Sequence, residues 1–185
     1  MRIAIAGASG TGKTTLSNAI AERYSLPINP VGARSVALSM GFDNPYDVDK
    51  AGKRVEFQRR LFEEKRDWEL AHESFVTDRT YLDNLTYCAL HMAEHLPDNA
   101  VQEFQKATER YDTIVFLPLE SFQSLDDGIR KTSRTYHDLY ELILNGLLHS
   151  EYLDRHHIVI WCESPLNVRE ARIFHAIDNE YGGAV

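Results

Sequence analysis

Three glycines followed by a Lys-Thr pair, close to the start of the chain, restrict the possible folds more than any other feature. Residues 7–14 read Gly-Ala-Ser-Gly-Thr-Gly-Lys-Thr, which fits the phosphate-binding pattern G-x-x-x-x-G-K-[ST]. Glycine lets the backbone turn tightly and approach an anion without a side chain in the way. The N–H groups of such a loop converge at the start of a helix, where the dipole favours negative charge. The pattern therefore predicts a loop that holds nucleotide phosphates.

Two side chains at the end of this loop have roles that follow from their chemistry. Lys13 is expected to reach the β- and γ-phosphates, and the Thr14 hydroxyl to bind the Mg²⁺ ion that accompanies the nucleotide. The other contacts should come mainly from main-chain N–H groups. The residues expected to bind the nucleotide are Gly7, Ala8, Ser9, Gly10, Thr11, Gly12, Lys13, Thr14 and Thr15.

The segments around the loop have the pattern that such a loop requires. Residues 2–6 alternate like a buried strand, and residues 14–24 have apolar side chains at helical spacing. Because strands separated by helices form parallel sheets covered on both faces, we expect the α/β class. Four further strands are expected at residues 25–32, 74–78, 112–117 and 157–161.

Helical spacing of apolar residues predicts most of the remaining chain. Residues 42–49 should form a loop, with Asp47 or Asp49 available to cap the helix that follows. No repeat or linker interrupts the pattern, so residues 1–185 are expected to form a single domain. The helix expected at residues 131–149 should face the core with Tyr136, Leu139, Tyr140, Ile143 and Leu147. Helices are expected at residues 33–40, 53–72, 82–93, 99–110, 131–149 and 166–177.

The composition indicates a globular protein with no membrane partner. Of 185 residues, 43% are hydrophobic and 26% are charged, and no run of eighteen apolar residues occurs. The first residues enter a strand directly, which leaves no room for a signal peptide. Cys88 and Cys162 lie inside expected regular elements and do not suggest a disulfide framework. These features together predict a cytoplasmic protein.

The charge distribution bears on the class of partner. A net charge of −8, from 20 basic and 28 acidic residues, argues against a general nucleic-acid coat protein. Residues 50–66 are locally positive, because they contain seven basic residues and three acidic ones. A local contact with a polyanion therefore stays open.

A second site is expected where the strand at residues 74–78 ends in Asp78-Arg79-Thr80. Ligands of open α/β sheets bind at the carboxyl ends of the strands, so Asp78 should point toward the phosphate loop. A carboxylate there can accept a proton from a substrate hydroxyl, or hold the Mg²⁺ shell through water. Arg79 would then bind a phosphate or carboxylate of the acceptor. The alternative is an Asp that caps the next helix beside a surface Arg.

A third group of charges occupies residues 126–134, where Arg130 and Arg134 would share one face of a helix that had already begun. Phosphoryl transfer needs cations that balance charge and a segment that excludes water. We therefore expect residues 120–135 to form a lid, with an ordinary solvated helix start as the alternative. Arg34, after the second expected strand, is a further candidate for binding an acceptor phosphate.

Together, the phosphate loop, the strand ending in Asp78-Arg79-Thr80 and the Asp-Gly-Ile-Arg130 segment resemble small P-loop kinases of the nicotinamide riboside kinase-like AAA type. The resemblance covers nearly the full chain, and bacteriophage-encoded members are the most similar. It implies a three-layer nucleoside- or nucleotide-kinase fold with a five-stranded parallel sheet in the order 2-3-1-4-5. It also implies phosphoryl transfer from ATP with Mg²⁺. Lys13, Asp78 and Arg130 would be catalytic, with Arg79 and Arg134 on phosphates.

The resemblance leaves the acceptor open. A free nucleoside or nucleotide is one class. Among similar phage proteins are kinases that phosphorylate hydroxymethyluracil in DNA, and the basic residues 50–66 would suit such a partner. A phage-encoded protein would work in the host cytoplasm, and both a monomer and a homodimer are compatible with the sequence.

Two alternative classes of nucleotide-binding protein fit the residues less well. Residues 49–52 match the D-x-x-G pattern of GTPase switches, but no N-K-x-D or T-K-x-D element occurs to read guanine. An ATPase module would need an acidic pair at the end of a strand to polarise water, and no Asp-Glu pair follows Asp78. A kinase is therefore the leading hypothesis.

Overall fold

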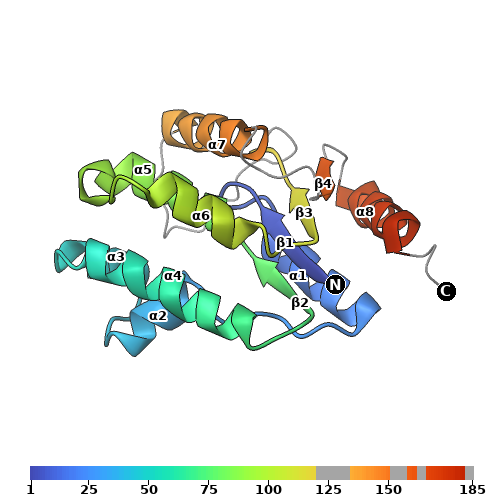
Figure 1. Ribbon diagram of the computed structural model, residues 1–185, viewed down its shortest axis with the longest axis horizontal. Coiled ribbons are helices and arrows are strands. Elements are labelled where there is room, and N and C mark those ends of the chain that lie inside the picture. Colours follow the sequence, from blue (N-terminus) through green and yellow to red (C-terminus); the bar gives the residue numbers. More distant parts are fainter. Residues whose placement is uncertain (120–133, 151–157, 162–165, 182–185) are drawn as a thin grey trace.

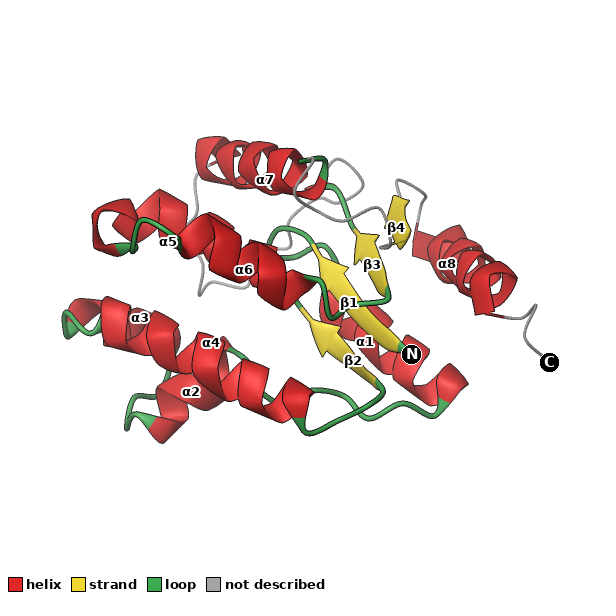
Figure 2. Ribbon diagram, in the orientation of Figure 1, coloured by secondary structure: helices red, strands yellow, loops and turns green. Residues whose placement is uncertain are grey.

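A four-stranded sheet with helices on both faces organises the molecule, as Figure 1 and Figure 2 show. The computed structural model describes residues 1–119, 134–150, 158–161 and 166–181. The strands are β1 (Arg2–Ala6), β2 (Phe75–Asp78), β3 (Thr113–Phe116) and β4 (Ile158–Trp161). The helices are α1 (Lys13–Tyr24), α2 (Ala33–Ser39), α3 (Pro45–Lys50), α4 (Arg54–Leu70), α5 (Tyr81–Met92), the 3₁₀ helix Ala93–His95, α6 (Ala100–Thr108), α7 (Arg134–Leu148) and α8 (Leu166–Tyr181). Among these helices, none is long and apolar enough to cross a bilayer.

The sheet brings the carboxyl ends of distant strands to one edge. Its order is β2-β1-β3-β4, and every neighbouring pair is parallel. Ile5 of β1 lies opposite Asp78 of β2 on one side and Val115 of β3 on the other. The phosphate loop after β1 and the acid that ends β2 therefore meet at the same edge. The predicted α/β class with a parallel sheet is confirmed.

One of the five expected strands, the second in chain order at residues 25–32, is not a strand in the structure. The segment makes a single parallel bridge, between Ile28 and Val76 of β2. The main-chain O of Pro27 accepts a hydrogen bond from Val76, and Asn29 donates one back. Pro27 has no N–H to donate to β2, and the Val31 N–H bonds instead to Asn29 Oδ1 at 2.9 Å, so the ladder does not extend. The five-stranded order 2-3-1-4-5 is thus not confirmed, although the segment lies at the predicted edge of the sheet.

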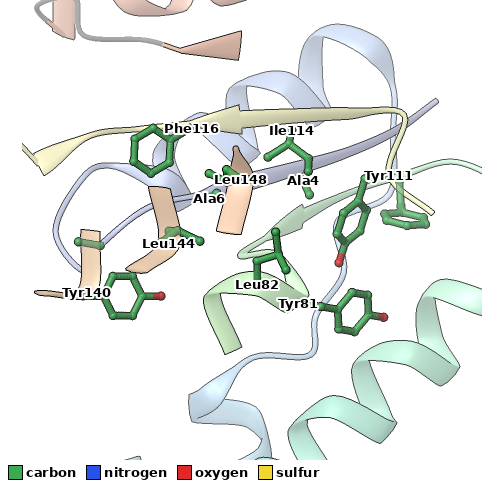
Figure 3. Close-up of a cluster of buried hydrophobic side chains, with 12 residues drawn as sticks. Ala4, Ala6, Tyr81, Leu82, Tyr111, Ile114, Phe116, Tyr140, Leu144 and Leu148 are labelled. Atoms are coloured by element: carbon green, nitrogen blue, oxygen red, sulfur yellow. The ribbon is translucent and has the colours of Figure 1, made fainter. Parts of the chain in front are cut away.

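Alternating side chains of β1 face two separate hydrophobic clusters. Ile3 and Ile5 pack with residues of α1 and α8 on one face of the sheet. Ala4 and Ala6 face the other cluster, which includes side chains of α5 and α7 and is drawn in Figure 3. The small alanines let the second helical layer approach the sheet closely, and this contact brings α5 and α7 near the phosphate loop.

Two expectations about helices are wrong. Residues 45–50 form the short helix α3 rather than a loop, because Asn44 accepts hydrogen bonds from Tyr46 N and Asp47 N and Pro45 starts the helix. Neither Asp47 nor Asp49 caps α4, which begins after Lys53 without a side-chain cap.

The inward face predicted for α7 is confirmed in part. Tyr140 is buried and Tyr136 and Leu147 pack against the same core cluster, but Leu139 is 45% exposed. The other buried positions of the helix are His137, Leu144 and Leu148.

A buried ion pair within α4 connects that helix, through Lys65, to β2, the strand that ends in Asp78. Lys65 Nζ lies 2.9 Å from Glu69 Oε1, and both side chains are almost fully buried. Lys65 also donates to Thr77 Oγ1, on the residue before Asp78. The Glu69 carboxylate accepts further hydrogen bonds from Asn29, Tyr81 and Tyr111. Buried charges are tolerated when they are paired and hydrogen-bonded in this way.

Candidate functional site

The loop at residues 7–14 has the form that its sequence predicts. Gly10 and Gly12 both have φ of 84°, a left-handed conformation that glycine adopts without strain. Helix α1 begins directly after Gly12, and its first turn contains no acidic residue. The positive end of the helix dipole therefore faces the loop without a neutralising side chain.

Lys13 folds back over the loop that precedes it. Its side chain is buried, with the residue 5% exposed. The ammonium donates to the main-chain O of Ala8 and lies 3.4 Å from Thr11 Oγ1. A cation held against the loop in this way can act directly on an anion that the loop binds.

Gly7 lies where the loop passes closest to β3. Its φ is +141°, and a Cβ atom at this position would lie 2.5 Å from the main-chain O of Leu117. That oxygen cannot move away easily, because Leu117 N donates to Ala6 O at 3.0 Å and so holds the two segments together. Only glycine fits here.

We expect Gly7→Ala to lower the free energy of unfolding by roughly 2–4 kcal/mol, from backbone strain and overpacking together. Gly10→Ala is the matched control, because Gly10 has a positive φ but no atom within 4 Å of the added Cβ. It should cost only the backbone strain, about 1–2 kcal/mol. Urea denaturation of both variants measures the difference, and equal losses would contradict the steric argument.

Thr14 and Asp78 meet at the carboxyl edge of the sheet. The Thr14 hydroxyl donates to Asp78 Oδ2 at 2.6 Å, although 64 residues separate the two in sequence. Asp78 Oδ1 is buried and has no hydrogen-bond partner among the described residues. The helix-capping alternative for Asp78 is not what the structure shows, because Thr80 caps α5. The predicted Mg²⁺ ligand and the predicted acid therefore share one site.

Arg79 follows Asp78 with an unusual backbone. Its φ is 80°, a left-handed conformation that a residue with a Cβ rarely adopts. The Arg79 guanidinium contacts Ser9 Oγ at 3.2 Å and the Tyr140 hydroxyl at 2.9 Å. Strained backbone of this kind is often found at functional sites. Here it aims the guanidinium at the phosphate loop.

Two residues that sequence reasoning missed also contact the loop. Asp83 accepts the Gly7 N–H at 3.1 Å. Arg169 of α8 is buried and donates from Nη1 to the Thr11 main-chain O at 2.8 Å. The capping-box spacing from Thr80 to Asp83 was a local signal for Asp83. No local pattern indicates Arg169, which reaches the loop only through the packing of α8.

Among the described residues, two of the predicted arginines are not joined to this site. Arg34 is exposed in the first turn of α2, and no hydrogen bond or ion pair links it to the loop within the described part of the chain. Arg134 is exposed at the start of α7 and pairs with Asp138 of the same helix at 3.7 Å. Arg130 and most of the expected lid, residues 120–133, lie outside the described residues.

The basic stretch at residues 50–66 is largely neutralised. Five of its seven basic residues form ion pairs, and four of the five acidic partners lie outside the stretch. These basic residues are Lys50, Arg54, Arg60, Lys65 and Arg66. The local positive charge is therefore balanced mostly by acids that lie just before and just after the stretch in the sequence.

The D-x-x-G match at residues 49–52 does not form part of the phosphate site. Asp49 instead accepts two hydrogen bonds from Arg54, each 2.9 Å long. The same carboxylate lies 3.4 Å from the Tyr87 hydroxyl. Asp49 thus has a structural role between α3, α4 and α5.

Comparison with known proteins agrees with this geometry. The AAA domain family matches residues 2–160. No curated protein matches the chain.

Among solved structures, several kinases share the fold. The deoxyadenosine kinase of M. mycoides with bound dATP is 16% identical, and the match covers 96% of this chain and 100% of that one, with a TM-score of 0.66. The shikimate kinase of Aquifex aeolicus is 16% identical over 100% of both chains, with a TM-score of 0.60. The NadR protein in complex with NR is 22% identical, with 99% of this chain and 52% of that chain covered and a TM-score of 0.62.

Proposed function

This chain belongs to the AAA domain family, and from that premise and the geometry of its site we propose that it is an ATP-dependent kinase. It transfers the γ-phosphoryl group of ATP to a hydroxyl group of a nucleoside- or nucleotide-type acceptor. A fold hosts many activities, so the proposal depends on the site rather than on the fold.

The 2.6 Å contact between Thr14 and Asp78 carries the proposal. It joins the last residue of the phosphate loop to an acid on a neighbouring strand. A nucleotide held by the loop would present its γ-phosphate beside this acid. The Asp78 carboxylate, whose Oδ1 has no partner among the described residues, would then lie beside a second substrate.

The transfer needs one bond to form and one to break. The acceptor oxygen bonds to the γ-phosphorus while the bond from that phosphorus to the β–γ bridging oxygen breaks. The electron pair of the broken bond leaves with ADP, and the hydroxyl proton passes to the Asp78 carboxylate. Lys13 balances charge on the transferring group, which is the main requirement of this chemistry.

The donor set fits Mg²⁺. This ion prefers oxygen ligands and usually binds through one or two carboxylates together with substrate phosphates. Thr14 Oγ1 and Asp78 Oδ2 would hold it, directly or through water. When bound, Mg²⁺ neutralises part of the phosphate charge.

Arg79 would bind a phosphate of the nucleotide or of the acceptor. Its side chain is 32% exposed, and its guanidinium contacts Ser9 of the loop and the Tyr140 hydroxyl. Other candidates for binding a phosphate are Arg130 and Arg134, from the expected lid, and Arg34 of α2.

Two observations favour a small nucleoside-type acceptor. Solved structures with this fold include kinases of deoxyadenosine, and a NadR protein bound to NR. Hydroxymethyluracil in DNA is the narrower alternative, and the pairing of the basic residues at 50–66 with acids removes much of its physical support.

A transfer screen with γ-labelled ATP and Mg²⁺ tests the proposal. The acceptors are free nucleosides, nucleoside monophosphates, nicotinamide riboside, shikimate and DNA that contains hydroxymethyluracil. Label on a nucleoside or nucleotide is the expected result. Label on DNA alone would establish the narrower alternative. Label on shikimate alone, or release of inorganic phosphate without any transfer, would overturn the proposal.

A further inference from the structure

Asp83 is a buried carboxylate at the centre of the contacts between the phosphate loop and the helices. Its side chain is 0% exposed. The Gly7 N–H donates to its Oδ1 at 3.1 Å, and the Tyr140 hydroxyl lies 3.0 Å from the same oxygen. Gly7 is the first residue of the loop, whereas Tyr140 belongs to α7. A single carboxylate oxygen therefore joins the loop to a distant helix.

The two oxygens of this carboxylate serve different parts of the structure. Oδ2 accepts from Thr80 N and Thr80 Oγ1 and completes the capping box of α5. Helix capping needs only Oδ2. The contacts of Oδ1 with Gly7 and Tyr140 are additional, and a residue that only capped α5 would not need them.

Tyr140 extends the connection to a second point of the loop. Its hydroxyl accepts from Arg79 Nη1 at 2.9 Å, and Arg79 Nη2 donates to Ser9 Oγ at 3.2 Å. Burial and then the charge of Asp83 raise the pKa of the Tyr140 hydroxyl well above its usual range. The hydroxyl therefore stays protonated and donates to Asp83. Gly7 and Ser9 are both held through this chain of contacts.

We propose that Asp83 and Tyr140 are positioning residues that hold the phosphate loop in the conformation that binds nucleotide. Neither side chain is placed on the substrates, so they act through Gly7, Ser9 and Arg79. The inference rests on the proposed function, because it assigns the network to nucleotide binding. It extends that function by coupling the loop to α7, a helix more than 100 residues later in the sequence.

Tyr140→Phe tests the network with the smallest change, since it removes one hydroxyl and keeps the buried ring. Tyr111→Phe is the matched control. Tyr111 is also a buried tyrosine of the same hydrophobic cluster, but its hydroxyl lies 3.3 Å from Glu69, away from the loop. Asp83→Asn is a second variant, because every partner of the carboxylate donates and the new NH₂ group would face one of them.

The measurements are thermal unfolding, the dissociation constant of Mg·ATP by calorimetry, and deuterium uptake of residues 7–12 by mass spectrometry. Tyr140→Phe removes the hydroxyl contacts with Asp83 and Arg79, so it should weaken Mg·ATP binding about fivefold to tenfold and speed exchange in the loop. Tyr111→Phe should lose comparable stability with neither change. If Asp83→Asn folds, its affinity should fall at least as far.

Three outcomes would count against the proposal. Wild-type affinity and loop exchange in folded Tyr140→Phe would overturn it and leave the kinase proposal intact. The same losses in Tyr111→Phe would show a general effect of stability and would also overturn it. A wild-type protein that binds no Mg·ATP would overturn the proposed function, and this inference with it.

Discussion

Replacing Lys13 with alanine is expected to lower kcat by about a thousandfold, with the acceptor that the transfer screen identifies. The ammonium is held by Ala8 and Thr11 within the loop, so its charge is already oriented toward the position of the phosphates. Charge stabilisation of this kind is worth most when the charge is preorganised and shielded from water. Steady-state kinetics at saturating Mg·ATP measure the loss.

The Lys13 variant should still fold, since the side chain makes loop contacts rather than core contacts. Losing its hydrogen bonds should lower the free energy of unfolding by only about 1 kcal/mol. Lys106→Ala is a suitable control, because Lys106 is an exposed lysine of α6 outside the site. Wild-type turnover in folded Lys13→Ala would remove Lys13 from the mechanism.

Asp78→Asn is expected to lower kcat by about two to three orders of magnitude, with little change in Mg·ATP affinity. The amide keeps the size of the carboxylate and can still accept from Thr14, but it cannot take a proton at the position of Oδ1. The experiment compares kcat with the dissociation constant of Mg·ATP in the same variant. Asp67→Asn is the matched control, because its side chain is 69% exposed at the end of α4.

Titration with Mg²⁺ separates the two roles of Asp78. If Asp78 acts as a base, the loss of rate persists at saturating Mg²⁺. If it acts mainly as a metal partner, added Mg²⁺ restores much of the rate. Wild-type kcat in Asp78→Asn at every Mg²⁺ concentration would contradict both roles.

Much of the fold could be predicted because parallel strands buried on both faces have a simple pattern. Each of the four observed strands was expected from its apolar run, and most helices end within a few residues of the predicted bounds. The segment at residues 25–32 has the same apolar character, but it forms only one bridge, because Pro27 has no N–H and the Val31 N–H bonds to Asn29 Oδ1. The prediction failed there because apolar character reports burial, whereas a ladder also needs N–H donors.

The inward face of α7 shows a second limit of prediction from the sequence. Leu139 and Tyr140 are neighbours in the sequence, and helical spacing alone fits a stripe through either of them. The structure buries Tyr140, whose hydroxyl bonds to Asp83 and Arg79, and leaves Leu139 45% exposed. A polar contact with another helix accompanies this choice of face, and hydrophobicity does not record it.

The sequence by itself determined the phosphate loop, because the conformations and chemistry that it needs depend on local residue types. Glycines at 10 and 12 adopt positive φ, and Lys13 starts the helix, whatever the rest of the chain does. Only the tertiary structure decided what surrounds the loop. Asp83, Tyr140 and Arg169 lie around it on three different helices. Such contacts depend on which distant segments the sheet brings together, and no local pattern encodes them.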